Sequence, residues 1–166
     1  MKNIYLVGFM GTGKTSVGRE LAGIKKLAFI DLDELILVRE EKTIAEIFTC
    51  QGEAYFRALE KKILAEVSQK DNQVVSCGGG IVTDKDNIVL MKNSGIIICL
   101  TARPEVILAR TKNYHHRPLL NDNYPEKKIR ELLEARECFY ALADYKIDTS
   151  DISLKEVVNK TLELIK

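Results

Sequence analysis

The fold is decided by the stretch GFMGTGKT at residues 8–15. It matches the pattern G-x-x-x-x-G-K-[ST], in which a glycine-rich loop binds phosphate groups. That pattern is meaningful only between a strand and a helix. Both are predicted here, because residues 2–7 are apolar and β-prone, and residues 14–24 place apolar side chains at helical spacing. The chain therefore opens with a βα unit built around a phosphate-binding loop.

The chemistry of this loop follows from charge. A nucleotide triphosphate needs several hydrogen-bond donors at close range, and glycines let successive backbone N–H groups point at the phosphates. We expect Lys14 to reach the β- and γ-phosphates and the Thr15 hydroxyl to bind Mg²⁺. The alternative, a glycine-rich turn beside an exposed lysine, is disfavoured by the strand-loop-helix context. The expected nucleotide contacts in the loop are Gly11, Thr12, Gly13, Lys14, Thr15 and Ser16.

The rest of the chain alternates between strand and helix patterns. This alternation predicts a single α/β domain over residues 1–166, with three layers and a largely parallel five-stranded sheet between helices. Strands are expected at residues 2–7, 27–31, 73–77, 95–100 and 145–148. Helices are expected at residues 14–24, 34–41, 43–50, 53–70, from 84, from 104, at 125–142 and from 153. Residues 114–124 lack regular apolar spacing and are expected to form a surface loop.

Polar and glycine residues follow two of the predicted strands. Asp31 and Asp33 are two residues apart at the end of the second strand, and in an extended chain they would point the same way. Mg²⁺ or a substrate hydroxyl would give such a pair a role, while capping of the following helix is the structural alternative. The triple glycine at residues 78–80 permits close approach of a ligand, although a plain turn is also possible. Ser76, just before it, could hold a water bound to Mg²⁺.

Three arginines stand out by position. Arg57 lies in an otherwise apolar stretch, Arg117 precedes a proline in the irregular loop, and Arg136 lies late in a helix. Individually, each is more often a solvated surface charge. Guanidinium groups that converge would instead bind a carboxylate or a transferring phosphoryl group. The sequence does not show whether they converge.

Composition excludes some classes of partner. The 166 residues carry 25 Lys and Arg against 24 Asp and Glu, a net charge of +1, which gives no global attraction to nucleic acid or to an anionic membrane. No apolar run approaches the roughly 20 residues that span a bilayer, and no signal segment is evident at the N-terminus. We expect a cytoplasmic protein without nucleic-acid or membrane partners. Its even surface charge favours a monomer.

Taken together, these residues resemble the shikimate kinase family over essentially the whole chain. The marks of the resemblance are GFMGTGKT, the DLD of residues 31–33, the GEAYFR that ends at Arg57, the triple glycine, the RPLL of residues 117–120, and Arg136. The resemblance implies a phosphate-binding-loop kinase related in fold to the nucleoside monophosphate kinases, with strand order 2-3-1-4-5. It also implies transfer of the γ-phosphoryl group of ATP to the 3-hydroxyl of shikimate, a step in the synthesis of chorismate and aromatic amino acids.

On the shikimate side, the resemblance implies a substrate-binding segment at about residues 33–62. Asp33 would bind the hydroxyls of shikimate and act as the catalytic base or orienting group. Arg57 and Arg136 would bind its carboxylate, and Gly79 and Gly80 would line the ring.

On the nucleotide side, the resemblance adds a metal site and a lid. Asp31 would hold Mg²⁺ through water together with Thr15, and Arg110 would stack on adenine. Arg117 would close over both substrates from a mobile lid at about residues 111–124, joining Lys14 in catalysis. Residues 148–153 lack a proline and resemble the family little, so we assign no nucleotide contact there.

Two other functions remain open from the sequence. A kinase of another small hydroxy acid such as gluconate, or of a nucleotide, would share the loop and the fold. The arginine and glycine set disfavours it. A nucleotide-sensing switch or a partner-binding ATPase would hydrolyse ATP without a small acceptor. Phosphoryl transfer to an acceptor needs exclusion of water, so we expect the lid to close when both substrates bind.

Overall fold

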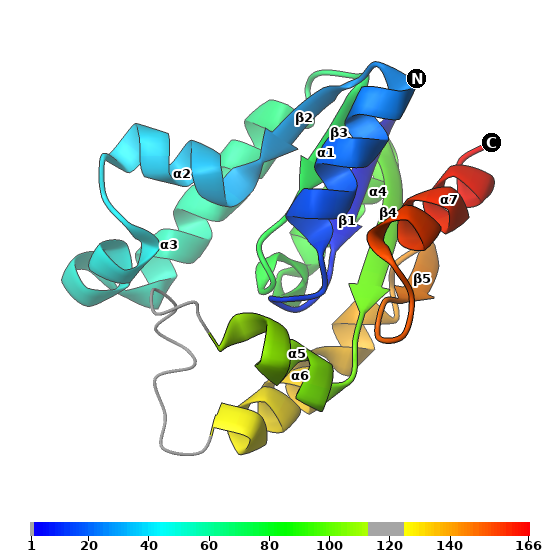
Figure 1. The fold of residues 1–166 in the computed structure, drawn as a ribbon. Coiled ribbons are helices and arrows are strands. Elements are labelled where there is room, and N and C mark those ends of the chain that lie inside the picture. Colours follow the sequence, from blue (N-terminus) through cyan, green and yellow to red (C-terminus); the bar gives the residue numbers. More distant parts are fainter. Residues whose placement is uncertain (1, 113–124) are drawn as a thin grey trace.

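The computed structural model describes residues 2–112 and 125–166. Its centre is a five-stranded sheet in which every neighbouring pair is parallel (Figure 1). The order β2-β3-β1-β4-β5 confirms the expected 2-3-1-4-5 arrangement. The strands are β1 (Asn3–Val7), β2 (Ala28–Asp31), β3 (Gln73–Ser76), β4 (Gly95–Thr101) and β5 (Tyr145–Asp148).

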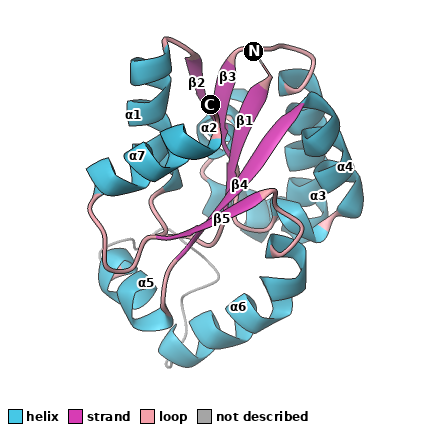
Figure 2. Ribbon diagram, turned by 90° about the vertical axis from the view of Figure 1, so that its right-hand side faces the viewer, coloured by secondary structure: helices cyan, strands magenta, loops and turns pink. Residues whose placement is uncertain are grey.

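Helices cover both faces of the sheet. Figure 2 shows α1 and α7 on one face and α3 and α4 on the other, which is the three-layer arrangement expected from the sequence. A short 3-10 turn, Ile81–Thr83, follows the triple glycine. The helices are α1 (Lys14–Lys25), α2 (Leu32–Glu40), α3 (Ile44–Val67), α4 (Lys85–Ser94), α5 (Pro104–Thr111), α6 (Pro125–Tyr140) and α7 (Leu154–Leu164).

Side chains on the two faces of β1 pack into two separate hydrophobic clusters. Side chains alternate along a strand, so Tyr5 and Val7 pack with α2, α3 and α4, whereas Ile4 and Leu6 pack with α1 and α7. Because every residue of β1 is buried, the strand is apolar almost throughout, as is usual for the centre of a parallel sheet. The central strand is thereby fixed from both sides, and so is the loop that leaves it.

A third, smaller hydrophobic cluster holds that loop against α5 and α6. Phe9 and Met10, which follow β1, are buried against Ile107 of α5 and Ile129 of α6. The apolar residues of the loop motif therefore pack in the interior, while Gly11, Gly13 and Lys14 line a pocket.

Local sequence signals fix several helix ends. Capping boxes form at Thr43 with Glu46 and at Ser153 with Glu156, as the spacing predicts. The helices expected at residues 43–50 and 53–70 are joined as α3, which ends at Val67 and is interrupted at Gly52, where φ is 82° and ψ is 169°. Within the described ranges, no helix is long and apolar enough to cross a membrane.

Candidate active site

The phosphate-binding loop joins the end of β1 to the start of α1. Gly13 caps α1 with a φ of 95°, a left-handed conformation in which a side chain would be strained. The helix therefore presents its first N–H groups, and the positive end of its dipole, to the loop. Lys14 is buried, and its Nζ donates hydrogen bonds of 2.9 Å to the carbonyl oxygens of Gly8 and Phe9. The ammonium group is thus held over the loop where phosphates would lie.

A pocket of about 610 Å³ opens at this loop, a volume within the range of small-molecule sites. Seven of the eight residues expected to contact the nucleotide line it. They are Gly11, Thr12, Gly13, Lys14, Thr15, Ser16 and Arg110. Both the loop and a residue from a distant helix therefore border one cavity.

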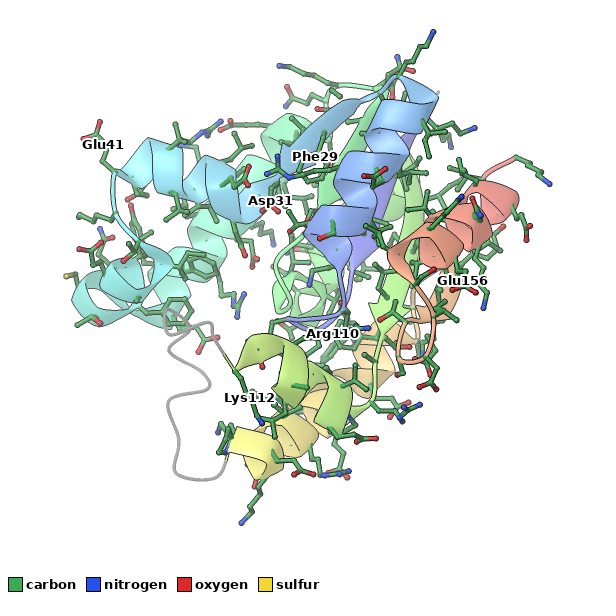
Figure 3. The ribbon with its side chains drawn as sticks, viewed as in Figure 1. Phe29, Asp31, Glu41, Arg110, Lys112 and Glu156 are labelled. Carbon is green, nitrogen blue, oxygen red and sulfur yellow. The ribbon has the colours of Figure 1, made fainter. Side chains whose placement is uncertain are left out.

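Arg110, near the end of α5, reaches the loop from the far side of the pocket (Figure 3). Its Nη1 donates to the carbonyl of Gly11 at 3.2 Å and to the hydroxyl of Thr149 at 3.0 Å, and its Nη2 donates to the Thr149 carbonyl at 2.8 Å. The guanidinium group is held between the phosphate-binding loop and the segment after β5. The expected stacking on adenine stays a prediction.

The segment after β5 also borders the pocket, which sequence reasoning did not anticipate. Thr149 and Ile152 line the cavity, together with Leu154 at the start of α7. The sequence predicts no nucleotide contact at residues 148–153, because this segment has no proline and resembles the shikimate kinase family little. A topological signal could have found them, because ligands of parallel sheets bind at the carboxyl ends of the strands, where β5 ends at Asp148.

A cluster of oxygen donors suits the expected magnesium site. The Thr15 hydroxyl donates to Asp31 Oδ2 at 2.8 Å and lies 3.4 Å from the hydroxyl of Ser76. Carboxylate and hydroxyl oxygens are hard ligands of the kind that Mg²⁺ uses, usually with waters and substrate phosphates completing the shell. The donor set therefore fits the ion.

The structure corrects one step of the sequence argument about the two aspartates. Because β2 ends at Asp31 and α2 begins at Leu32, Asp33 lies in the first turn of a helix, and the two side chains are not paired along a strand. Asp31 caps α2, since its Oδ1 accepts from the N–H groups of Asp33 and Glu34. The capping alternative is therefore confirmed for one carboxylate oxygen, and the other faces Thr15.

The triple glycine after β3 is surrounded by charged side chains from three helices. A Cβ on Gly80 would lie 2.3 Å from Nη2 of Arg57, and one on Gly78 would lie 3.2 Å from Oδ1 of Asp33. A Cβ on Gly79 would meet Nη1 of Arg136 at 3.6 Å. The absence of side chains here is what lets two arginines and an aspartate converge.

This charged cluster adjoins the phosphate-binding loop. A Cβ on Gly79 would lie 3.3 Å from the carbonyl oxygen of Gly8, and the buried guanidinium of Arg136 lies over the ring of Phe9, 5.6 Å from its centre. The Tyr140 hydroxyl donates to the carbonyl of Gly79 at 2.7 Å, and burial raises the pKa of that hydroxyl to about 12. Tyr140 thus stays a neutral donor that fixes the glycine segment.

Glu60 is a further member of the cluster that sequence reasoning missed. It is 1% exposed, and its Oε2 accepts from Arg57 Nη1 at 2.8 Å, while Oε1 has no hydrogen-bond partner among the described residues. Burial raises the pKa of Glu60 to about 7, against the opposing effect of Arg57. The sequence does contain a signal for this residue, because Glu60 is a charged residue on the apolar stripe of α3, between Phe56 and Ile63. A charged residue in such a position is unusual.

One expected catalytic residue cannot be placed. Arg117, and the lid at about residues 111–124 apart from Thr111 and Lys112, lie outside the described residues.

The fold and the site define a class of protein. A parallel sheet covered by helices, a phosphate-binding loop with its lysine, and a neighbouring charged cluster that contains two arginines are the parts of a kinase that phosphorylates a small anionic molecule. The family model named shikimate kinase matches residues 10–166, so the chain belongs to the shikimate kinase family.

Individual relatives agree with this assignment. A shikimate kinase from Caldanaerobacter subterraneus is 49% identical over 98% of this chain and 95% of its own length. A solved shikimate kinase from Acinetobacter baumannii, in complex with shikimate, superposes with a TM-score of 0.96 at 39% identity and covers 99% of this chain and 93% of its own. The enzyme from Aquifex aeolicus gives a TM-score of 0.86 at 38% identity, covering 98% of this chain and 95% of its own.

Proposed function

We propose that this protein transfers the γ-phosphoryl group of ATP to the 3-hydroxyl of shikimate, giving shikimate 3-phosphate for aromatic amino-acid synthesis. Its membership of the family supports a small-molecule kinase with ATP as co-substrate. The observation that carries the assignment of the acceptor is the convergence of Arg57, Arg136 and Asp33 on the triple glycine, beside the phosphate-binding loop. This cluster offers two cations for one carboxylate and a carboxylate for hydroxyl groups.

The charges of this cluster suit an acceptor that is both an acid and a polyol. Arg57 and Arg136 would bind the carboxylate with paired N–H donors, and each is already held, Arg57 by Glu60 and Arg136 over Phe9. Gly79 and Gly80 would let the ring approach the backbone closely. Gluconate is also an acid and a polyol, so it is membership of the shikimate kinase family that favours shikimate over it. A nucleotide acceptor gains no specific support from these contacts.

The chain's own residues would accomplish the transfer mainly by positioning and charge. Asp33 would hold the 3-hydroxyl and accept its proton as the hydroxyl oxygen bonds to the γ-phosphorus and the bond to the ADP oxygen breaks. Lys14 and the N–H groups of the loop would stabilise the charge on the moving phosphoryl group. Arg117 would add positive charge from the lid.

We also propose that Mg²⁺ binds at Thr15 and Asp31, with Ser76 beside them. When bound, the ion would neutralise negative charge on the phosphates. The cap on α2 would hold Asp31 in place for this role, since the same carboxylate accepts hydrogen bonds from two backbone N–H groups.

The wider organisation expected from the sequence stays a prediction. It comprises a single domain over residues 1–166, a substrate segment at about 33–62, a lid at about 111–124, a monomer, and a cytoplasmic location. The exposed apolar side chains that the structure describes are spread over several helices and β5, which supports the monomer.

The release of ADP, measured with several acceptors, tests the proposed function. Purified protein with ATP and Mg²⁺ would be given shikimate, gluconate, a nucleoside monophosphate, or no acceptor. We expect stimulation by shikimate alone, with shikimate 3-phosphate identified by mass spectrometry. Stimulation by another acceptor only, or equal turnover without any acceptor, would refute the proposal.

A further inference from the structure

Thr149 connects three parts of the nucleotide pocket. It is buried, 3% exposed, just after β5, and its backbone N–H donates to the carbonyl of Thr101 at 2.9 Å. Its hydroxyl oxygen lies 3.0 Å from Arg110 Nη1, 3.2 Å from the carbonyl of Thr12 and 3.1 Å from the carbonyl of Thr101. One hydroxyl thus links α5, the phosphate-binding loop and the end of β4.

The donors and acceptors can be assigned. A guanidinium group only donates, so the Thr149 hydroxyl accepts from Arg110 and has a single proton left for one of the two carbonyls. The Thr149 carbonyl accepts a second hydrogen bond from the same guanidinium, at 2.8 Å from Nη2. Arg110 therefore has two adjacent acceptors on one residue, and its Nη1 also reaches the carbonyl of Gly11.

This arrangement matters because Arg110 is exposed and long. A free arginine side chain would lose rotamer entropy on being ordered against a ligand. An arginine that is already held at the pocket wall loses less, so binding is tighter. A buried threonine that accepts its hydrogen bond supplies this order before the nucleotide arrives.

We infer that Thr149 is a positioning residue for nucleotide binding. Its hydroxyl orients the Arg110 guanidinium at the pocket and, through Thr12, fixes the backbone of the phosphate-binding loop. The inference rests on the proposed function, in which Arg110 contacts the nucleotide. The role is separate from the shikimate cluster, since the hydrogen bonds of Thr149 within the described part of the chain go to Arg110, Thr12 and Thr101 and not to Asp33, Arg57, Glu60 or Arg136.

The isosteric substitution Thr149→Val tests the hydroxyl. It keeps the shape of the side chain but removes the hydroxyl that accepts from Arg110 Nη1 and donates to a backbone carbonyl, while the Thr149 and Gly11 carbonyls still accept from the guanidinium. We expect the Kd for ADP, measured by calorimetry, and the KM for ATP to rise about 5- to 10-fold, because a hydrogen bond to a charged group is lost. The KM for shikimate and kcat should change less than about two-fold. Thr149→Ser keeps the hydroxyl and should restore most of the affinity.

Thr161→Val is a matched control. Thr161 is also buried, but among the described residues its hydroxyl donates within α7, to the carbonyl of Val157. It should lower thermal stability without a selective change in the affinity for nucleotide. A rise in the KM for both substrates in Thr149→Val, or failure of Thr149→Ser to restore ADP affinity, would show a merely structural role and overturn the inference.

A double-mutant cycle with Arg110→Ala separates this inference from the proposed function. If Thr149 acts through Arg110, Thr149→Val should weaken ADP binding much less in the Arg110→Ala background than in the wild type. Additive effects would overturn the inference even where shikimate is phosphorylated normally. Failure of the proposed function would be seen differently, as a wild-type protein that shows no shikimate-dependent ADP release.

Discussion

The two sides proposed for the site, one for the nucleotide and one for shikimate, are built in different ways. Six of the expected nucleotide contacts lie in one run of residues, 11–16, whose backbone forms a single loop and the first turn of α1. The shikimate side gathers Asp33, Arg57, Glu60 and Arg136 from α2, α3 and α6 around residues 78–80. One side depends on local backbone geometry, and the other depends on long-range packing.

The two sides also differ in how their charged groups are stabilised. In the loop, the donors are backbone N–H groups and one lysine, and the lysine donates to the carbonyls of Gly8 and Phe9. On the shikimate side, the Glu60 carboxyl group is buried, and its hydrogen bond from Arg57 offsets only part of the cost of burial. Changes on the shikimate side should therefore alter acceptor binding, turnover and pH behaviour while leaving nucleotide affinity unchanged.

The largest expected effect follows the change Asp33→Asn. An amide can hold a hydroxyl but is a very weak base, so kcat should fall about 10²- to 10³-fold. The Kd for ADP should stay within about two-fold of wild type, because Asp33 does not line the nucleotide pocket. Steady-state kinetics and calorimetry measure both quantities.

Glu34→Gln serves as the control for this change, because Glu34 is in the same helical turn but pairs with exposed Arg19. It should retain near-normal turnover. Near-normal turnover of Asp33→Asn would instead remove the assigned role of Asp33.

The next effect concerns pH and the change Glu60→Gln. Because the pKa of Glu60 rises from 4.5 to about 7 on folding, the folded protein holds more protons than the unfolded chain between these values. The free energy of unfolding therefore falls as the pH rises from 4.5 to about 7. Wild type should lose about 3 kcal/mol more free energy of unfolding than Glu60→Gln between pH 4.5 and pH 7.5. Urea unfolding across this range measures it.

The matched control is Glu53→Gln. Glu53 also contacts Arg57, at 3.2 Å, but it is exposed. This variant should keep the pH dependence of wild type. An unchanged slope in Glu60→Gln would show that the buried carboxylate does not titrate near neutrality.

The smallest effect is expected for Gly80→Ala. The added methyl would displace the Arg57 guanidinium from its place 2.3 Å away, and this should raise the KM for shikimate about 10-fold with little change in the KM for ATP. Kinetics with each substrate varied in turn would measure this selectivity.

Gly23→Ala is the control for this prediction, because a Cβ there has nothing within 4 Å. It should leave both KM values unchanged and stabilise α1 by about 0.5–1 kcal/mol. An equal change of both KM values in Gly80→Ala would show that the two sides are coupled through the glycine segment.

Local patterns were enough to predict much of the fold. The phosphate-binding loop, the capping boxes at Thr43 and Ser153 and the alternation of strand and helix are each encoded within a few residues, so they are readable from the chain. The strand order was predicted from the resemblance to the shikimate kinase family, which several separated motifs carry. The helical placement of Asp33 was mispredicted, because the exact end of a short strand depends on a hydrogen bond to the cap rather than on apolar spacing.

The sequence by itself determined the phosphate-binding loop motif at residues 8–15 and its place between β1 and α1, because backbone conformation and charge there are local properties. Only the tertiary structure decided that Arg57 and Arg136 meet at the triple glycine, that Glu60 is buried beside Arg57, and that Thr149 contacts Arg110. The reason is physical. A charged side chain is expected at the surface when only the sequence is known. Its energy in the folded protein is set by neighbours that the fold brings close, such as Thr149, which lies 39 positions from Arg110 in the chain.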